Sequence, residues 1–234
     1  MNHNIKFLDW LSGLIDGVGC FILSKKGYGS LEITMDVRDA YCLSRIKTHY
    51  GGAIKLRVGN HSIRYRLHHK DGLLRLLNDV NGRLRNSNRL LQFSKLCANY
   101  AIIMLDIIPL LYNSNWMAGF FDTDGTIIIN GATNQLVISI SQKTQELLVP
   151  LQFLYKGNIY IDRSSNTFKW YLTKKEDILK IIDNYIKNNY IYSEKRKRLF
   201  LVKKFYELKE LKKQDNFLFD KCWNSFIIKW NNFE

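Results

Sequence analysis

The 234-residue sequence is poor in the residues that mark disordered chains and zinc ribbons. It has only two prolines, and 46% of its residues are hydrophobic, which favours a folded chain over a disordered one. No two of its four cysteines form a C-x-x-C pair, so the sequence argues against a zinc knuckle. We expect all four cysteines to be buried thiols in a reducing compartment.

Long apolar runs are also missing. The longest candidate, residues 101–112, is interrupted by Asp106 and Pro109 and is too short to cross a bilayer. Residues 1–7 are too short and polar for a secretory signal. The sequence therefore predicts no membrane partner.

Acidic residues are scarce relative to basic ones. The chain has 35 Lys and Arg against 21 Asp and Glu, for a formal net charge of +14. Such a field attracts polyanions, and the aromatic content of 13% adds stacking surfaces, so we expect a nucleic-acid partner. The richness in Asn, Lys, Ile, Tyr and Phe suggests an AT-rich genome, which predicts a mitochondrial or other organellar location.

The chain contains an internal repeat with a spacing of about 105 residues. Five segments of the first half align with five of the second: residues 11–19 with 117–125, 31–35 with 136–140, 52–54 with 157–159, 65–67 with 170–172, and 71–77 with 176–182. We therefore divide the chain into an N-terminal half (1–105), a C-terminal half (106–212) and an aromatic extension (213–234).

Each half reads as α-β-β-α-β-β-α, which is an α+β fold with pseudo-symmetric halves. The alternating strands predict a four-stranded sheet with one wet face in each half. Strands are expected at residues 20–25, 31–37, 53–58 and 62–68, and at 126–130, 135–141, 158–162 and 167–173. Helices are expected at 39–50 and 72–80, and at 144–155 and 175–187, with a further helix after each half.

The repeated opening helix carries unusual glycines. Gly13 and Gly119 fall in mid-helix, where glycine costs about 1 kcal/mol relative to alanine. Beside small neighbours they offer a face on which two helices can approach closely. Gly19 and Gly125 are expected to cap the helix ends. Acids just before these glycines would meet at a pseudo-twofold axis, poised to share divalent metal ions.

Residues 11–19 and 117–125 resemble the repeated motif of single-chain LAGLIDADG homing endonucleases and their intron-encoded maturases. The resemblance extends over residues 7–211. It implies a monomer whose two halves form a saddle over the DNA major groove and cut both strands using magnesium. It also implies that the acid before each final glycine binds the metal. That position is Asp124 in the second motif and Val18 in the first, and the resemblance extends the metal site to Gly17.

The first motif departs from this pattern at Val18. Valine cannot ligate magnesium, which requires hard oxygen ligands. Asp16 lies two residues earlier, about 200° around the helix, and so points away from that position. Since Asp16 and Asp122 match each other, we predict that they share a structural role. Double-strand cleavage is predicted to be lost or much reduced.

The resemblance further implies a basic residue near the active centre at the start of the helix that closes each half. Arg89 and Lys195 occupy these positions. Arginine stays charged and cannot shuttle a proton, so the first half departs here too. Lys195 is a candidate catalytic residue, although a solvated basic face or a phosphate contact is an alternative interpretation.

Polar side chains on the strands are candidates for contacts with nucleic acid, some to base edges and most to phosphate. The candidates are Lys25, Lys26, Lys55, Arg57, Arg64 and Arg66 in the first half, and Asn130, Gln135, Arg163 and Lys169 in the second. Past residue 213, aromatic residues at helical spacing predict a helix with an apolar face, either docked on the body or open to a protein partner.

Three functions fit these patterns. The chain could be an active homing endonuclease that uses Asp124 and Mg²⁺. It could be a non-cleaving maturase that binds its group I intron RNA. It could also be a domesticated RNA-binding protein of an organellar ribosome. All three predict double-stranded DNA or structured RNA as the partner.

Overall fold

The computed structural model describes residues 3–213 and 219–232. The N-terminal half contains α1 (His3–Val18), β1 (Gly19–Leu23), β2 (Gly29–Asp36), α2 (Ala40–Tyr50), β3 (Ala53–Leu56), β4 (Ser62–Leu67), α3 (Lys70–Val80) and α4 (Ser87–Asn99). The C-terminal half contains α5 (Trp116–Asp124), β5 (Gly125–Asn130), β6 (Gln135–Gln142), α6 (Leu148–Tyr155), β7 (Asn158–Asp162), β8 (Thr167–Leu172), α7 (Lys175–Lys180) and α8 (Arg196–Lys213), and α9 (Phe219–Asn231) follows. The predicted α+β architecture of two similar halves is confirmed.

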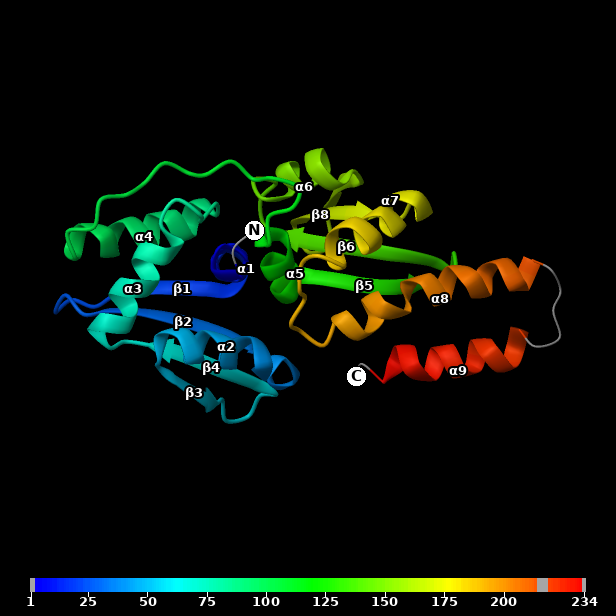
Figure 1. Cartoon of the computed structure of the whole chain (residues 1–234), viewed down its shortest axis with the longest axis horizontal. Coiled ribbons are helices and arrows are strands. Elements are labelled where there is room, and N and C mark those ends of the chain that lie inside the picture. Colours follow the sequence, from blue (N-terminus) through cyan, green and yellow to red (C-terminus); the bar gives the residue numbers. More distant parts are fainter. Residues whose placement is uncertain (1–2, 214–218, 233–234) are drawn as a thin grey trace.

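Each half contains one antiparallel four-stranded sheet. The strand orders are β1-β2-β4-β3 and β5-β6-β8-β7, and the two sheets lie on either side of the central pair α1 and α5 (Figure 1). In β2 the side chains alternate strictly between buried and half-exposed, with Leu31 and Ile33 in the core. One face of the sheet therefore packs on helices, and the other stays open, as the alternation predicts.

The two opening helices pack along their glycines. A Cβ atom added to Gly13 would lie 1.9 Å from the carbonyl oxygen of Trp116, and one added to Gly119 would lie 1.8 Å from that of Trp10. The helix backbones are therefore in direct contact, and no side chain fits between them. This confirms the predicted small-residue face and explains why the sequence accepts glycine in mid-helix.

The glycines at the ends of these helices lie at the predicted cap positions, and the Gly125 amide donates to the carbonyl of Phe121. The helices end where expected, but Gly125 has an extended backbone with φ −70° and ψ 147° rather than a left-handed one. A Cβ there would lie 2.1 Å from the Phe121 ring, and a Cβ on Gly19 would lie 2.8 Å from Ile15 Cγ2. Both positions require glycine because the preceding helical turn packs against them.

The strand register corrects the repeat alignment. Gly19 pairs with Ile33, whereas Gly125 pairs with Ile140. Ile33 therefore corresponds to Ile140, and the predicted match of residues 31–35 with 136–140 is wrong by two. A shift of two residues leaves every side chain on the same face of the sheet, so the alternation pattern could not reveal it. By the same register, Met35 in β2 corresponds to Gln142 in β6.

Several predicted boundaries also change. The helix expected at 144–155 begins only at Leu148, and the helix expected at 175–187 divides into α7 and a π-helical segment, Ile181–Ile186. The four cysteines are free thiols. Cys42 and Cys97 are buried as predicted, but Cys20 is half-buried and Cys222 is exposed. Among the described residues, no helix is long and apolar enough to span a membrane.

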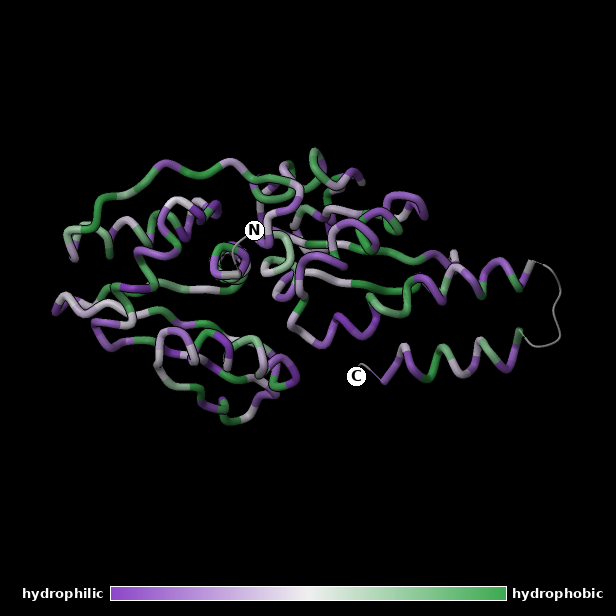
Figure 2. Tube along the Cα trace, viewed as in Figure 1, coloured by the Kyte–Doolittle hydropathy of each residue, from purple (hydrophilic) through white to green (hydrophobic). Residues whose placement is uncertain are grey.

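An extended linker joins the halves across the surface, and Figure 2 shows hydrophobic residues along it. Asn81 holds this linker by donating to the carbonyl of Ile103 at 2.8 Å and accepting from the amide of Leu105 at 2.9 Å. The predicted division between residues 105 and 106 falls within it. That division into folding units stays a prediction.

The aromatic extension forms α9, which packs antiparallel to α8 (Figure 1). Phe226 and Trp230 are buried. The Arg198 guanidinium donates to the carbonyl of Trp230 at 3.1 Å and to that of Ile127 at 3.2 Å, which ties α9 to the edge strand β5. The predicted helix therefore docks on the body. Phe217 and Phe233, also part of that prediction, lie outside the described residues.

Candidate active centre and nucleic-acid interface

The C-terminal ends of α1 and α5 meet at the centre of the molecule. A Cβ atom added to Gly17 would lie 3.0 Å from Asp124 Oδ2 and 2.1 Å from Thr123 Oγ1. The Asp124 carboxylate therefore rests against the last turn of α1. This geometry brings together two of the predicted metal-site residues, Asp124 and Gly17.

Asp124 is held by its neighbour on β6. The Gln142 amide donates to Asp124 Oδ2 at 2.5 Å. Burial raises the pKa of Asp124, while the Gln142 hydrogen bond and the charges of Lys195 and Arg89 oppose that shift. The carboxylate is thus oriented and lies near two cations, an arrangement suited to holding a polar or cationic group. Nothing in the local sequence around Gln142 indicates this role, because its partner Asp124 is 18 residues away along the chain.

The N-terminal half has no equivalent of this pair. Val18 stands at the position of Asp124, and the strand register places Met35 at the position of Gln142. Across the described residues, no three His, Cys, Asp or Glu side chains are grouped to hold a metal ion. The donors present, one carboxylate and one carboxamide in a single half, do not fit a two-metal centre.

Lys195 lies just before α8 and reaches back to the end of α5. Its ammonium donates to the carbonyls of Phe121, Asp122 and Thr123 at 3.1, 2.9 and 2.8 Å. All three N–H bonds of the ammonium are used to cap the helix. Burial lowers the pKa of Lys195, and the nearby acids, led by Asp122, oppose that shift. Its predicted catalytic role remains a prediction.

Arg89 belongs to α4 of the other half, near enough for its charge to act on Asp124. Its Nε is buried and has no hydrogen-bond partner among the described residues. The charges of both predicted basic residues therefore act on the Asp124 carboxylate. The Lys195 ammonium is hydrogen-bonded to backbone carbonyls, whereas the Arg89 Nε, among the described residues, has no hydrogen-bond partner.

The first aspartate of each motif bonds the tryptophan of the other half and the segment before the closing helix of its own half. Asp16 accepts hydrogen bonds from the Trp116 indole at 2.7 Å and from the amides of Arg85 and Asn86 at 2.9 and 3.1 Å. Asp122 makes the matching set, from the Trp10 indole at 2.8 Å and from the amides of Tyr192 and Ser193 at 3.0 and 2.9 Å. These contacts confirm the predicted structural role of the two aspartates.

Burial also shifts the protonation of these two aspartates. It raises the pKa of Asp16 to about 7, although the hydrogen bonds from Asn86 and Trp116 oppose that shift. Burial likewise raises the pKa of Asp122. Each carboxylate is therefore a pH-sensitive element of the contact between the halves.

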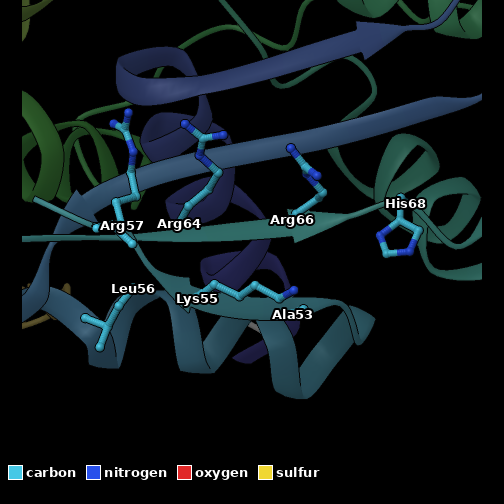
Figure 3. Close-up of a pocket in the computed structure, with 8 residues that line it drawn as sticks. Ala53, Lys55, Leu56, Arg57, Arg64, Arg66 and His68 are labelled. Atoms are coloured by element: carbon cyan, nitrogen blue, oxygen red, sulfur yellow. The ribbon is translucent and has the colours of Figure 1, made fainter.

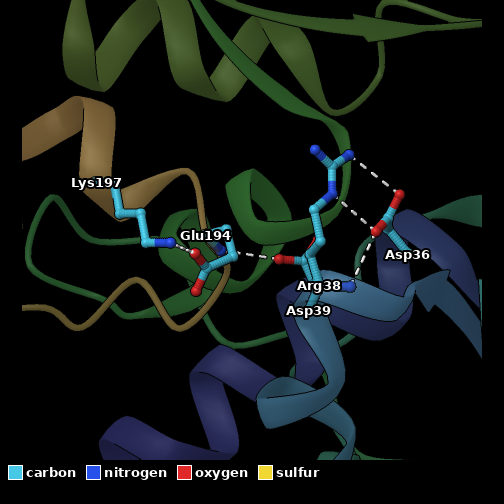
Figure 4. A network of polar contacts seen from close by, with 5 residues as sticks. All are labelled: Asp36, Arg38, Asp39, Glu194 and Lys197. Atoms are coloured by element: carbon cyan, nitrogen blue, oxygen red, sulfur yellow. Dashed lines mark hydrogen bonds and ion pairs between the residues drawn. The ribbon is translucent and has the colours of Figure 1, made fainter. Parts of the chain in front are cut away.

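A second pair of acids spans the same contact further out. Asp39 accepts from the amide of Glu194 at 2.8 Å, next to the Asp36–Arg38 and Glu194–Lys197 ion pairs (Figure 4). In the reciprocal position, Glu146 accepts from the amide of Ser87 at 3.2 Å. Each acid lies beside the start of the other half's closing helix, where the unpaired amides attract negative charge.

The open face of the N-terminal sheet gathers most of its predicted contact residues. Arg64 and Arg66 extend from β4 to the same side of the sheet, and Lys55 lies across from Arg64 on β3 (Figure 3). With Arg57 they line a hollow of about 390 Å³. Lys25 and Lys26 lie apart from this hollow, in the turn after β1.

The open face of the C-terminal sheet is less charged. Lys169 lies on β8 with its ammonium 5.3 Å from the centre of the Tyr171 ring. Asn130 and Gln135 pair across the end of the β5–β6 hairpin, where the Asn130 carboxamide accepts from the amide of Ala132. Arg163 lies in the turn between β7 and β8. Of the four predicted residues, the structure places only Lys169 near the middle of the face.

The sequence matches the family described as LAGLIDADG endonuclease over residues 11–100 and 117–206. These two matches are the two halves, each beginning within its opening helix. The chain therefore belongs to the LAGLIDADG endonuclease family.

Curated relatives carry two kinds of name. An intron-encoded RNA maturase, bI4, of Saccharomyces cerevisiae is 42% identical over 99% of this chain and 38% of its own length. An intron-encoded DNA endonuclease, ai2b, of Dictyostelium discoideum is 36% identical over 96% of this chain and 89% of its own length. Another relative is the probable intron-encoded endonuclease aI2 of Debaryomyces hansenii, which is 37% identical over 96% of this chain and 37% of its own length. The chain therefore spans less than two fifths of the length of this relative and of the maturase.

Solved structures share the fold. I-SmaMI bound to an uncleaved DNA target in the presence of calcium ions matches with a TM-score of 0.64 and 18% identity, over 95% of this chain and 97% of that one. The LAGLIDADG meganuclease I-CpaMI bound to uncleaved DNA matches with a TM-score of 0.65 and 17% identity, over 95% and 97%. These matches support the two-half architecture of the described structure.

Proposed function

We propose that this chain binds nucleic acid across its two open sheet faces as a monomer and has lost most or all double-strand cleavage. The observation that carries the proposal is the one-sided centre. Asp124 and Gln142 form an oriented polar pair in one half, while Val18 and Met35 occupy the same positions in the other. Cutting two strands requires two equipped phosphate sites, and this chain offers one.

The partner follows from charge and from the relatives. The net charge of +14 and the cationic face around Arg64 favour a polyanion. A relative named as a DNA endonuclease and one named as an RNA maturase both align with nearly the whole chain, so duplex DNA and structured intron RNA are both candidates. Their shared description as intron-encoded supports an origin in an organellar intron, and we place the protein there.

A second candidate function is that of an active endonuclease that nicks or cuts slowly. The intact Asp124–Gln142 pair favours it, because the carboxylate is already oriented and faces the adjoining helix. In that case Asp124 and Gly17 would hold a divalent cation, and Mg²⁺ is the ion that we propose. The neighbour described with calcium supports a divalent ion in this fold.

A cleavage assay separates these candidates. The substrate is a supercoiled plasmid that carries the duplex sequence enriched by the protein from a randomised pool, incubated with Mg²⁺. We expect the unaltered protein to give no linear product, and at most a slow nick in one strand. We expect the triple variant Val18→Asp, Met35→Gln, Arg89→Lys to raise the rate of linear product by at least tenfold.

The matched control is Asp124→Asn in both backgrounds. It should abolish any nick by the unaltered protein and any linear product of the triple variant, while leaving duplex binding in place. Rapid linearisation by the unaltered protein would overturn the proposed loss of cleavage. Failure to retain any duplex or RNA on a filter at low salt would overturn nucleic-acid binding itself.

A further inference from the structure

One carboxylate lies in the middle of the basic open face. Glu32 on β2 sits directly opposite Arg66 and diagonal to Arg64 on β4. Arg66 Nε donates to Glu32 Oε1 at 2.7 Å, and Arg64 Nη1 lies 3.2 Å from Glu32 Oε2. Each carboxylate oxygen therefore holds one guanidinium group. The glutamate side chain is only 16% exposed, because it lies between the arginines.

Two hollows on this face share Arg66, and Glu32 lines one of them. One, of about 390 Å³, is lined by Arg57, Arg64 and Arg66, and the other, of about 410 Å³, by Ser30, Glu32 and Arg66. Among the residues that line the two hollows, Glu32 is the only acid. A face built merely to attract phosphate would gain by lacking it, since the acid cancels one unit of positive charge.

The fold itself does not require this acid. In the C-terminal half, the strand register places Ser139 opposite Tyr171, just as Glu32 stands opposite Arg66. Lys169 takes the place of Arg64 and is steadied by the Tyr171 ring instead of by a carboxylate. The same sheet is therefore stable without the charged triad of Glu32, Arg64 and Arg66.

Fixed guanidinium groups suit base recognition more than phosphate attraction. Glu32 contacts Arg66 through Nε and Nη2 and Arg64 through Nη1, so Nη1 of Arg66 and Nη2 of Arg64 make no contact with this carboxylate. A preorganised arginine can donate two bonds to the O6 and N7 atoms of guanine in the major groove, whereas a mobile one contacts any phosphate. Holding the side chain before binding also removes the entropy loss of ordering it.

We propose that Glu32 is a positioning residue for sequence recognition. It fixes Arg64 and Arg66 to read guanine-containing steps of duplex DNA through the N-terminal half, and it limits binding to unrelated duplex. This inference rests on the proposed nucleic-acid binding and assigns one part of that function to one half of the molecule.

The test is selection from a pool of 30-base-pair DNA duplexes with randomised positions, using the whole chain without Mg²⁺. We expect the unaltered protein to enrich a site whose two sides are read by the two halves. Glu32→Gln should lose base preference by about tenfold at guanines on one side only, while the other side keeps its preference and serves as an internal control. Binding to unselected duplex should strengthen by about three- to tenfold, because one negative charge is gone.

Two further variants separate geometry from charge and from folding. Glu32→Asp keeps the charge but withdraws the carboxylate, so it should lose the same guanine preference without strengthening binding to unselected duplex. Glu207→Gln on α8 makes the same charge change outside the sheet, where Glu207 pairs with Lys204, and should alter neither side.

Each outcome decides the inference. Equal weakening on both sides, or unchanged preference in Glu32→Gln, would overturn it while leaving nucleic-acid binding intact. Enrichment from an RNA pool but not from the DNA pool would also overturn it, in favour of RNA as the ligand. Absence of binding to either pool would overturn both this inference and the proposed function.

Discussion

The two halves keep the same scaffold and differ where the chemistry would occur. Each opening helix carries a glycine that admits the other helix and an aspartate that bonds the other half's tryptophan. The side chains at the helix ends do not match: Asp124, Gln142 and Lys195 in one half correspond to Val18, Met35 and Arg89 in the other. The residues common to both halves are therefore those that hold the two halves together.

The open faces differ in the same way. The N-terminal face orders its arginines with Glu32, whereas the C-terminal face uses tyrosines, with Tyr160 and Tyr171 packed edge to face. Charged side chains give strong, directional hydrogen bonds, and tyrosines give contact area and a hydroxyl. We infer that the two halves read their portions of a target by different chemistry.

The largest expected effect comes from the glycines that the halves share. Gly13→Ala and Gly119→Ala each place a methyl group inside a backbone carbonyl of the partner helix. The helices must separate, so we expect each variant to lose at least about 3 kcal/mol of unfolding free energy. Urea unfolding checks this. Gly131→Ala, where a Cβ meets nothing within 4 Å, is the control and should change stability by less than about 0.5 kcal/mol.

The next effect concerns pH and Asp16. Burial raises its pKa from the ordinary aspartate value of 3.8 to about 7 in the folded protein, so between these values the folded state holds a proton that the unfolded state has released. This stabilisation is complete below the unfolded value and is lost as pH rises through about 7. We expect Asp16 to lower the unfolding free energy by about 1.4 kcal/mol for each pH unit between pH 5 and pH 7. Other titrating groups add their own contributions to the measured slope.

Asp16→Asn should flatten that decline, measured by urea unfolding at the two pH values. It should also lower stability by about 2 to 4 kcal/mol at pH 7, because one amide cannot accept all the hydrogen bonds from Trp116, Arg85 and Asn86. Asp122→Asn is the matched variant in the other half. A flat profile for the unaltered protein would contradict the burial argument.

A smaller effect is expected at the outer acids. Asp39→Asn and Glu146→Gln each weaken a bond to the start of the other half's closing helix. We expect each to lower stability by about 1 kcal/mol, as loss of a helix cap does. Equal losses would mean that the two contacts are equivalent. A loss confined to Asp39→Asn would locate the stronger contact at Lys195, which lies beside it.

The smallest effect concerns phosphate contacts. Lys55→Gln and Lys169→Gln each remove one cation from an open sheet face. Lys55 lies on β3 opposite Arg64, and Lys169 takes the place of Arg64 on β8. Each should reduce the salt dependence of duplex binding by about one unit of slope if that lysine contacts phosphate. Filter binding across a salt series measures it. If the slope changes for only one of the two variants, that lysine contacts phosphate and the other does not.

Some predictions rested on too little information in the chain. The match of β2 with β6 was wrong by two residues because alternation repeats every two residues, and only the pairing of Gly19 with Ile33 resolves it. The catalytic role of Lys195 stays a prediction, and its three bonds to backbone carbonyls become visible only when α5 is in place. The sequence does not single out Glu32, because its arginine partners come from another strand.

The sequence by itself determined the two-half fold, the helix-to-helix contact at Gly13 and Gly119, and the lack of a second acid at Val18. These follow from local patterns and from residue chemistry, which need no coordinates. Only the tertiary structure decided that Gln142 orients Asp124, that Met35 is its counterpart, and that Glu32 holds two arginines. Each of these depends on which strands lie side by side, and strand pairing is set by packing across the whole half.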